Sequence, residues 1–104
     1  MGLFRDFVGS FPGKPVPVAY PAGYDWTFIY WYLMRFGGKS PFGSQCLDIK
    51  SLAFVLLDGK SWRETNKHNF PKQWMPDRPH THDGLEDAIE QGEMFCRMLR
   101  EIQK

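Results

Sequence analysis

The sequence predicts an α/β fold in which a short pair of parallel strands is packed by helices. Strand-like and helix-like segments follow one another in the order helix, strand, helix, strand, helix, loop, helix. A helix between two successive strands of one sheet favours a parallel pairing of those strands. With 104 residues, of which 42% are hydrophobic, the chain is long enough for one domain with a modest core.

The first half of the chain supplies a helix, a strand and a second helix. Residues 3–11 have apolar side chains at helical spacing, and Pro12 and Gly13 stop that pattern. The stretch "PVPVAY" (15–20) predicts a short strand, although its prolines lack the N–H that a strand ladder needs. Residues 24–36 are bulky and apolar at nearly every position, so we expect a helix that is buried on most sides and ends at two glycines.

The second half supplies a strand that continues into a helix, a long loop and a final helix. Residues 45–57 predict the strand and helix, with Leu52, Val55 and Leu56 facing inward, and residues 58–81 predict an irregular loop. The final helix is expected to bury one face, and its remaining face is rich in Glu and Arg. The residues expected on the buried face are Leu85, Ala88, Ile89, Gly92, Phe95, Cys96, Leu99 and Ile102.

The composition excludes several classes of protein. The formal net charge is +1, so no global field indicates a nucleic-acid or membrane partner. Cys46 and Cys96 lack a C-x-x-C spacing and predict two free, buried thiols rather than a disulfide. The stretch "WTFIYWYLM" has nine residues, too few to span a bilayer, and the first ten residues show no secretion signal. We therefore expect a cytoplasmic protein with no membrane partner.

The stretch "HTHDGLEDA" (80–88) precedes the final helix and allows two interpretations. Asp83 followed by Glu86 is typical of a helix cap, and a cap alone would explain the polar residues. Alternatively, His82 lies in the loop before the helix, from which its side chain could converge with Asp87 on one point. Spacing within this stretch leaves both interpretations open.

Three segments in order resemble the DEDDh 3′–5′ exonucleases, a family that includes oligoribonuclease, ribonuclease T and polymerase proofreading subunits. The pattern H-x-x-x-x-D-A, from His82 to Ala88, is similar to the family's third motif. "PVPVAYPAGYDWTFIYWYL" resembles the second motif, in which a strand and turn deliver an Asp, here Asp25, to the start of a helix. "CLDIKSLAF" resembles the stretch between those motifs, where Asp48 would be structural. The resemblance covers about residues 3–104.

This resemblance implies metal-dependent 3′–5′ exonucleolytic hydrolysis of phosphodiester bonds at the single-stranded 3′ ends of DNA or RNA. The family uses two divalent ions, Mg²⁺ or Mn²⁺, which prefer oxygen ligands. It implies that Asp25 and Asp87 are metal-site carboxylates. His82 would be the general base that deprotonates the attacking water, a role that suits imidazole near neutral pH.

The sequence departs from the family pattern at the first motif, an Asp-x-Glu on the family's first strand. Before Asp25 the chain has one acid, Asp6, and its first glutamate is Glu64. We therefore predict an N-terminally truncated ribonuclease H-like exonuclease fold, with residues 1–104 as a single partial exonuclease domain. The isolated chain is expected to be weak or inactive, and to form a homo-oligomer that covers the exposed edge of the first strand. The alternative is a non-catalytic remnant that acts as a nucleic-acid-binding or oligomeric interaction module.

Basic and aromatic residues alternate in residues 62–78, a combination that suits single-stranded nucleic acid. The nucleic-acid-binding candidates are Tyr24, Arg63, Lys67, Lys72 and Trp74. The alternative is a surface loop held to the core by its aromatic side chains. The aromatic cluster in residues 26–32 favours a core or interface role over base stacking. The three histidines and two cysteines match no standard zinc spacing.

Overall fold

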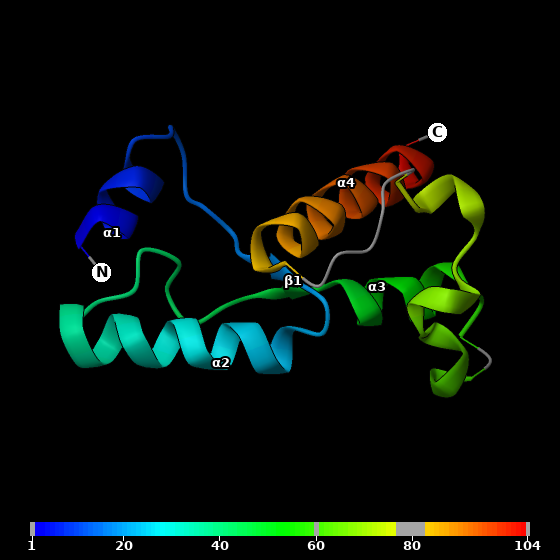
Figure 1. The fold of residues 1–104 in the computed structure, drawn as a ribbon, viewed down its shortest axis with the longest axis horizontal. Helices are drawn as coiled ribbons and strands as arrows, with labels where there is room; N and C mark the ends of the chain where they lie inside the picture. Colours follow the sequence, from blue (N-terminus) through cyan, green and yellow to red (C-terminus); the bar gives the residue numbers. More distant parts are fainter. Residues whose placement is uncertain (1, 60, 77–82, 104) are drawn as a thin grey trace. The chain divides into compact units, whose positions relative to one another are not determined.

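The computed structural model of the chain describes residues 2–59, 61–76 and 83–103. Its helices are α1 (Gly2–Gly9), α2 (Ala22–Tyr32), α3 (Ile49–Leu56) and α4 (Gly84–Ile102), and its strands are β1 (Val18–Ala19) and β2 (Leu47–Asp48) (Figure 1). A π-helical turn, η1 (Leu33–Gly37), continues α2. Three short 3₁₀ turns, η2 (Trp62–Thr65), η3 (Lys67–Asn69) and η4 (Lys72–Trp74), lie between α3 and α4. The chain divides into two compact units, Met1–Ile49 and Lys50–Lys104, and each is described by itself.

The strand pair of the first unit is parallel, as the sequence predicts. Val18 pairs with Leu47 and Ala19 with Asp48. β1 is shorter than the predicted strand at 15–20, because the prolines in that stretch have no N–H to donate. A carbonyl can still accept, and the Leu47 N–H donates to the Pro17 oxygen at 2.8 Å. Helices and a small parallel sheet together make a mixed α/β architecture.

α2 matches the predicted helix at 24–36 in extent but not in burial. The helix and η1 end at Gly38, whose φ of 71° favours glycine. No residue of α2 is buried, so the expectation of a helix buried on most sides is wrong. One side of α2 and η1 packs within the unit, where Leu33 is buried and Trp26 contacts the Phe42 ring edge-on at 5.9 Å. The aromatic residues on the other side are exposed because no described segment of this unit covers them.

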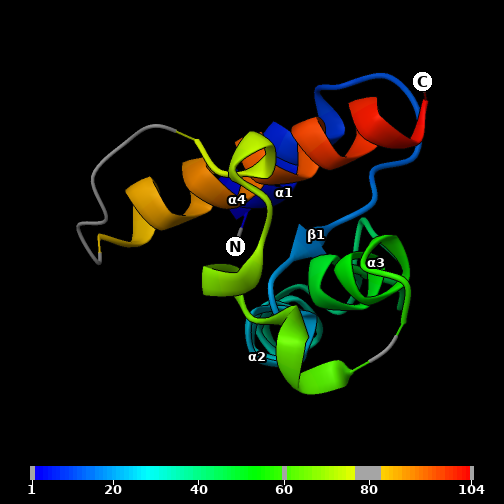
Figure 2. The same ribbon diagram turned by 90° about the vertical axis from the view of Figure 1, so that its right-hand side faces the viewer.

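The second unit is organised around α4 and the loop that carries η2, η3 and η4. The buried residues of α4 are Glu90, Met94 and Met98, which follow one another at a spacing of four. This stripe differs from the predicted apolar face, of which Leu85 and Ile102 are exposed. The difference arises because η4 packs against α4, as Figures 1 and 2 both show, and the loop supplies a cationic partner for Glu90.

Two further predictions of burial are corrected. In α3 the buried side chains are Ile49 and Ala53, whereas Val55, expected to face inward, is exposed. Cys96, expected on the buried face of α4, is exposed, and Cys46 is half-buried. Both thiols are free, as predicted. Among the described residues, no helix is both long enough and apolar enough to cross a membrane.

Candidate functional site

Asp25 lies in the first turn of α2, and the start of that helix is fixed by another acid. The Ala22 N–H donates to the Asp48 Oδ1 oxygen at 2.9 Å. Asp48 is the last residue of β2, and its carboxylate caps a helix that begins 26 residues earlier in the sequence. A capping carboxylate satisfies an N–H that has no partner inside the helix and interacts favourably with the helix dipole. Asp48 is therefore structural, as predicted, and it holds the helix turn that carries Asp25.

The surroundings of Cys46 show where negative charge gathers in this unit. Burial, then the carboxylate of Asp48 and then that of Asp25, raise the pKa of the Cys46 thiol. Both acids therefore lie close enough to Cys46 for their charges to act on it. The end of β2 and the first turn of α2 form an acidic corner that favours cations. Because its thiol stays protonated at neutral pH, Cys46 is unsuited to be a nucleophile.

Asp87 lies in the first turn of α4. Asp83 occupies the predicted N-cap position with extended backbone, but its side chain makes no cap hydrogen bond. The Asp83 carbonyl accepts the Asp87 N–H at 2.8 Å. A carboxylate in a first helical turn is stabilised by the positive end of the helix dipole. His82, the predicted general base, and His80 lie outside the described residues. Asp87 thus belongs to the second unit, whereas Asp25 belongs to the first unit.

Two of the predicted nucleic-acid contacts serve to attach the loop to α4. The Lys67 Nζ lies 3.4 Å from the Glu90 Oε1, and Glu90 is buried. Trp74 is 2% exposed, its ring meets Phe70 edge-on at 5.2 Å, and its indole N–H donates to Glu101. A base cannot stack on a ring that is covered in this way. For Trp74 the structure therefore favours the alternative of a loop held by its aromatic side chains.

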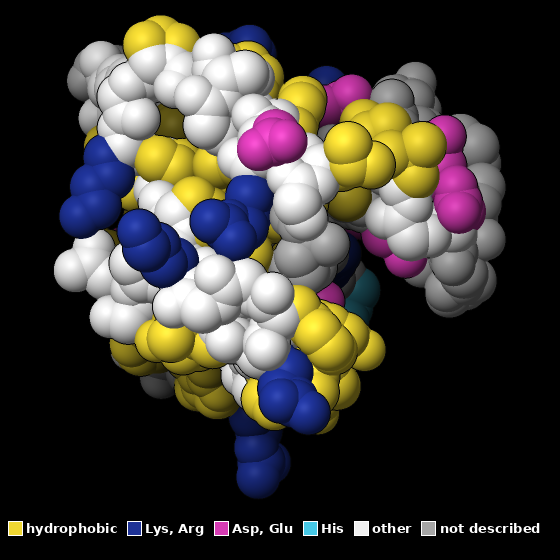
Figure 3. Space-filling model, turned by 90° about the vertical axis from the view of Figure 1, so that its left-hand side faces the viewer, with side chains coloured by type: hydrophobic (Ala, Val, Ile, Leu, Met, Phe, Trp, Pro, Cys, Tyr) yellow, Lys and Arg dark blue, Asp and Glu magenta, His cyan; other side chains and the backbone are white. Residues whose placement is uncertain are grey.

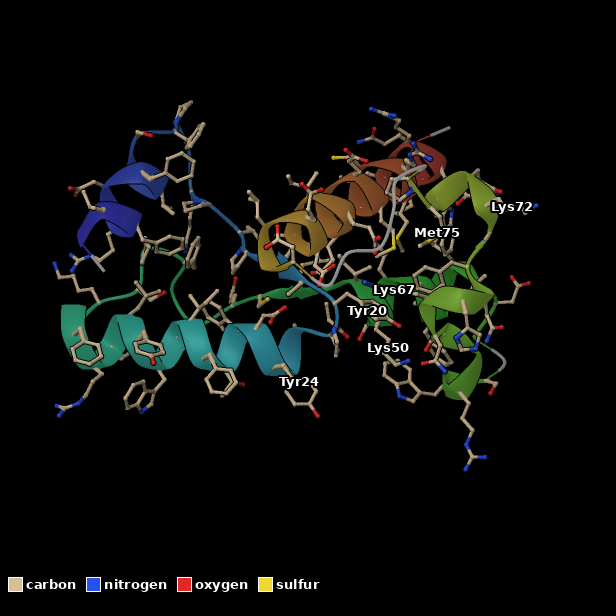
Figure 4. The ribbon with its side chains drawn as sticks, in the orientation of Figure 1. Tyr20, Tyr24, Lys50, Lys67, Lys72 and Met75 are labelled. Atoms are coloured by element: carbon tan, nitrogen blue, oxygen red, sulfur yellow. The ribbon has the colours of Figure 1, made fainter. Side chains whose placement is uncertain are left out.

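The other predicted contacts are exposed. Arg63, Lys72 and Tyr24 all lie at the surface, and Figure 4 shows the side chains of Lys72 and Tyr24 extending outward. Sequence analysis missed a further basic and aromatic pair, in which the Lys50 Nζ lies 4.7 Å from the centre of the Trp62 ring. The eleven residues that separate Lys50 from Trp62 in the sequence place this pair beyond the reach of a local pattern. Cations beside exposed rings suit phosphates and bases.

A pocket of about 330 Å³ lies beside η4 in the second unit. It is lined by Gln73, Trp74, Arg97, Arg100 and Glu101. Arg97 is held there by its Nη1, which donates to the Met75 carbonyl at 2.8 Å. Of the predicted site residues that the structure describes, Trp74 alone lines this pocket.

The implied pair of divalent ions can be tested against the donors that the described ranges contain. Asp25 and Asp87 offer carboxylate oxygens, the type of ligand that Mg²⁺ and Mn²⁺ prefer. Within residues 2–59, 61–76 and 83–103, no three His, Cys, Asp or Glu side chains form a group that could hold a metal ion. The donor type fits the implied ions, and within each unit the described residues bring together fewer donors than a two-metal centre needs.

Comparison with known proteins supports the resemblance found in the sequence. No protein-family model matches the chain. The chain is 40% identical to a protein of Escherichia coli named 3′–5′ DNA exonuclease Cap18, over 98 residues that cover 91% of this chain and 52% of that protein. The chain therefore has a 3′–5′ exonuclease as a relative and spans about half of its length. This share fits the prediction that the resemblance concerns one part of such an enzyme.

Proposed function

We propose that this chain is the C-terminal part of a DEDDh-type, metal-dependent 3′–5′ exonuclease with a ribonuclease H-like fold. The observation that carries the proposal is the 40% identity to a 3′–5′ DNA exonuclease across 91% of the chain. The parallel strand pair, with a helix following each strand, supports the fold. The relative's name supports DNA as the substrate, with hydrolysis at single-stranded 3′ ends.

The proposed roles rest on the motif resemblance and, for the two carboxylates, on their places in the helices. Asp25 and Asp87 are the metal-site carboxylates, each presented by the first turn of a helix. His82 precedes α4 in the sequence and accepts the proton of the attacking water. Arg63 and Lys72, which are exposed, contact the phosphates of the strand, and Tyr24 stacks on a terminal base.

The isolated chain is proposed to be weak or inactive, because two carboxylates and a histidine are too few donors for two divalent ions. The remaining acids then come from another part of a longer enzyme or from another chain. Because the remaining acids come from elsewhere, residues 1–104 are proposed to form one partial exonuclease domain.

The sharpest test places this chain in the context of its relative. In a chimera, the chain replaces the matching 52% of the E. coli exonuclease, and Mn²⁺-dependent shortening of a 5′-labelled single-stranded DNA is followed on a gel. We expect a ladder of shortened products for the chimera and a loss of at least about 100-fold in rate for Asp25→Asn, Asp87→Asn or His82→Ala.

Asp58→Asn is the matched control, because Asp58 is exposed and its positive φ of 69° suits asparagine. The control is expected to keep the rate of the unmodified chimera. Three active site variants that degrade DNA as fast as this control would refute the assignment of the site. A folded but inactive chimera would favour the alternative, a non-catalytic module that binds nucleic acid or another chain.

A further inference from the structure

The pocket beside η4 in the second unit carries two arginines that the proposed nuclease chemistry does not use. Its walls come from η4, which supplies Gln73 and Trp74, and from the last turns of α4, which supply Arg97, Arg100 and Glu101. The volume is about 330 Å³, and pockets that bind small molecules begin at about 300 Å³. The pocket is therefore large enough for a phosphate group together with part of the molecule that bears it.

Hydrogen bonds between α4 and the loop before it fix the walls of this pocket. The Arg97 Nη1 donates to the Met75 carbonyl at 2.8 Å, and Figure 4 shows Met75 near the last turns of α4. The indole N–H of the buried Trp74 donates to the Glu101 carboxylate. Because these groups are already held in place, little order has to be created when a ligand binds.

The side chains that line the pocket suit an oxyanion. Arg97 and Arg100 are three positions apart, so they lie on the same face of α4. A guanidinium has five N–H donors in a planar fork that matches two phosphate oxygens, so the bond of Arg97 to the loop backbone leaves donors for a ligand. Gln73, which is exposed, adds an amide N–H. Against the two cations the lining sets the carboxylate of Glu101, which accepts from Trp74, and one positive charge remains in surplus.

Positive charge alone does not identify a binding site in this protein. Figure 3 shows Lys and Arg side chains spread among hydrophobic side chains over one face of the molecule. Arg97 and Arg100 have a second feature, because they line a pocket in which Arg97 is half-buried. A guanidinium that is partly shielded from water attracts an anion more strongly than one that is fully hydrated.

The pocket is separate from the carboxylate of α4 that is proposed to hold metal. Arg97 follows Asp87 by ten residues on α4, which corresponds to about 15 Å along the helix axis. A single phosphate group is too small to contact both positions. An anion in the pocket therefore does not compete with the metal ions proposed at Asp87.

From these observations we propose that Arg97, Arg100 and Gln73 bind the phosphate group of a nucleotide. The phosphate follows from the two guanidinium groups and the amide, whereas the nucleotide as its carrier rests on the proposed function. Two sources share this chemistry, namely a free 5′-mononucleotide and the phosphodiester backbone of a single strand. Each is a ligand that the experiment offers separately.

The test follows the Trp74 indole N–H by proton–nitrogen NMR spectroscopy of the full chain, because this group lies at the pocket. The probes are inorganic phosphate, thymidine 5′-monophosphate and a short oligothymidylate without terminal phosphates, each added at constant ionic strength. We expect inorganic phosphate and at least one of the two nucleotide probes to shift this signal until it saturates. Saturation by the monophosphate identifies the free nucleotide, and saturation by the oligothymidylate alone identifies the strand.

Arg100→Gln is expected to raise the dissociation constant at least about tenfold, because charge-assisted hydrogen bonds to phosphate are lost. Arg100 is exposed, so the variant keeps the packing of α4. Arg35→Gln is the matched control, since Arg35 is also exposed and also lies in the last turn of a helix, but in the first unit. Both variants lose a favourable interaction with a helix dipole, and only Arg100→Gln is expected to weaken binding.

Glu101→Gln is expected to have the opposite effect. Its amide oxygen can still accept the Trp74 indole N–H, while the negative charge that repels a phosphate is removed. The dissociation constant should therefore fall about two- to fivefold. Weaker or unchanged binding by Glu101→Gln would show that the ligand is not held as an anion and would overturn the proposal.

The proposal is also overturned if none of the three probes shifts the Trp74 signal, or if Arg100→Gln binds as tightly as Arg35→Gln. Binding of inorganic phosphate alone would overturn the assignment of a nucleotide as its carrier. These measurements need no nuclease activity, whereas the chimera reports activity. A chain that binds phosphate and yields an inactive chimera would contradict the proposed function alone, and an active chimera with no phosphate binding would contradict the pocket alone.

Discussion

α2 and α4 are both rich in apolar residues, yet the structure secures them in different ways. α4 buries Met94 and Met98 completely, and side chains and backbone of the preceding loop bind its Glu90, Arg97 and Glu101. α2 buries none of its own residues and is attached through its capped first turn and one packed side. The difference shows that apolar content predicts how much surface a helix must cover, but not what covers it.

The largest expected difference between the two helices concerns truncation of an apolar side chain. Met98→Ala should lower the free energy of unfolding by about 2–5 kcal/mol, because it leaves a cavity where a fully buried side chain was. Phe28→Ala should change it by less than about 1 kcal/mol, because Phe28 is exposed. Urea denaturation of the two variants compares the two losses. Equal losses would show that α2 is as well packed in solution as α4.

A smaller effect is expected from the ion pair that attaches the loop to α4. Lys67→Met should cost about 1–2 kcal/mol of stability, because the buried Glu90 loses a cationic partner. Adding Glu90→Leu to Lys67→Met should restore part of the loss, since no buried charge then remains. Urea denaturation of the two variants provides the measurement. If the double variant is less stable than Lys67→Met, the carboxylate of Glu90 has another essential partner.

The sequence predicts the elements well because their signals are local. The extent of α2 and the N-cap at Asp83 follow from residues a few positions apart, and the parallel pairing follows from the order strand, helix, strand. The buried face of α4 was wrongly predicted because its burial depends on a distant loop. Glu90 is polar in the pattern, and the ion pair with Lys67, 23 residues earlier, favours its burial.

The candidate site divides in the same way. The motifs predict Asp25 and Asp87 at helix starts, and both occupy first turns, while their role in metal binding stays a prediction. The Lys50 and Trp62 pair was missed because the two residues meet only once the chain turns back after α3. Trp74 has the residue type of a stacking platform, but its burial is a property of the packed loop and not of the sequence pattern.

Loss of the contact that attaches the start of α2 should lower the free energy of unfolding by about 1 kcal/mol. Asp48→Ala removes the acceptor of the Ala22 N–H, so stability should fall by that amount and the first turn of α2 should fray. Asp48→Asn keeps an oxygen acceptor and should lose less. Amide hydrogen exchange at residues 22–26 measures the fraying directly. Protection that is unchanged in Asp48→Ala would show that the strand pair alone fixes this helix start.

The smallest expected effect compares the cysteines of the two units. The raised pKa of Cys46, caused by burial and then by Asp48 and Asp25, keeps its thiol protonated in the folded state. A group whose pKa is higher in the folded than in the unfolded state contributes stability at lower pH, and that stability is lost as the pH rises through the folded pKa. The free energy of unfolding should therefore fall more steeply above about pH 9 in the unmodified chain than in Cys46→Ser.

Cys96, exposed on α4, should react with iodoacetamide before Cys46 at about pH 8, as peptide mass spectrometry can show. Faster modification of Cys46 would mean that the acidic corner around Asp25 and Asp48 opens in solution.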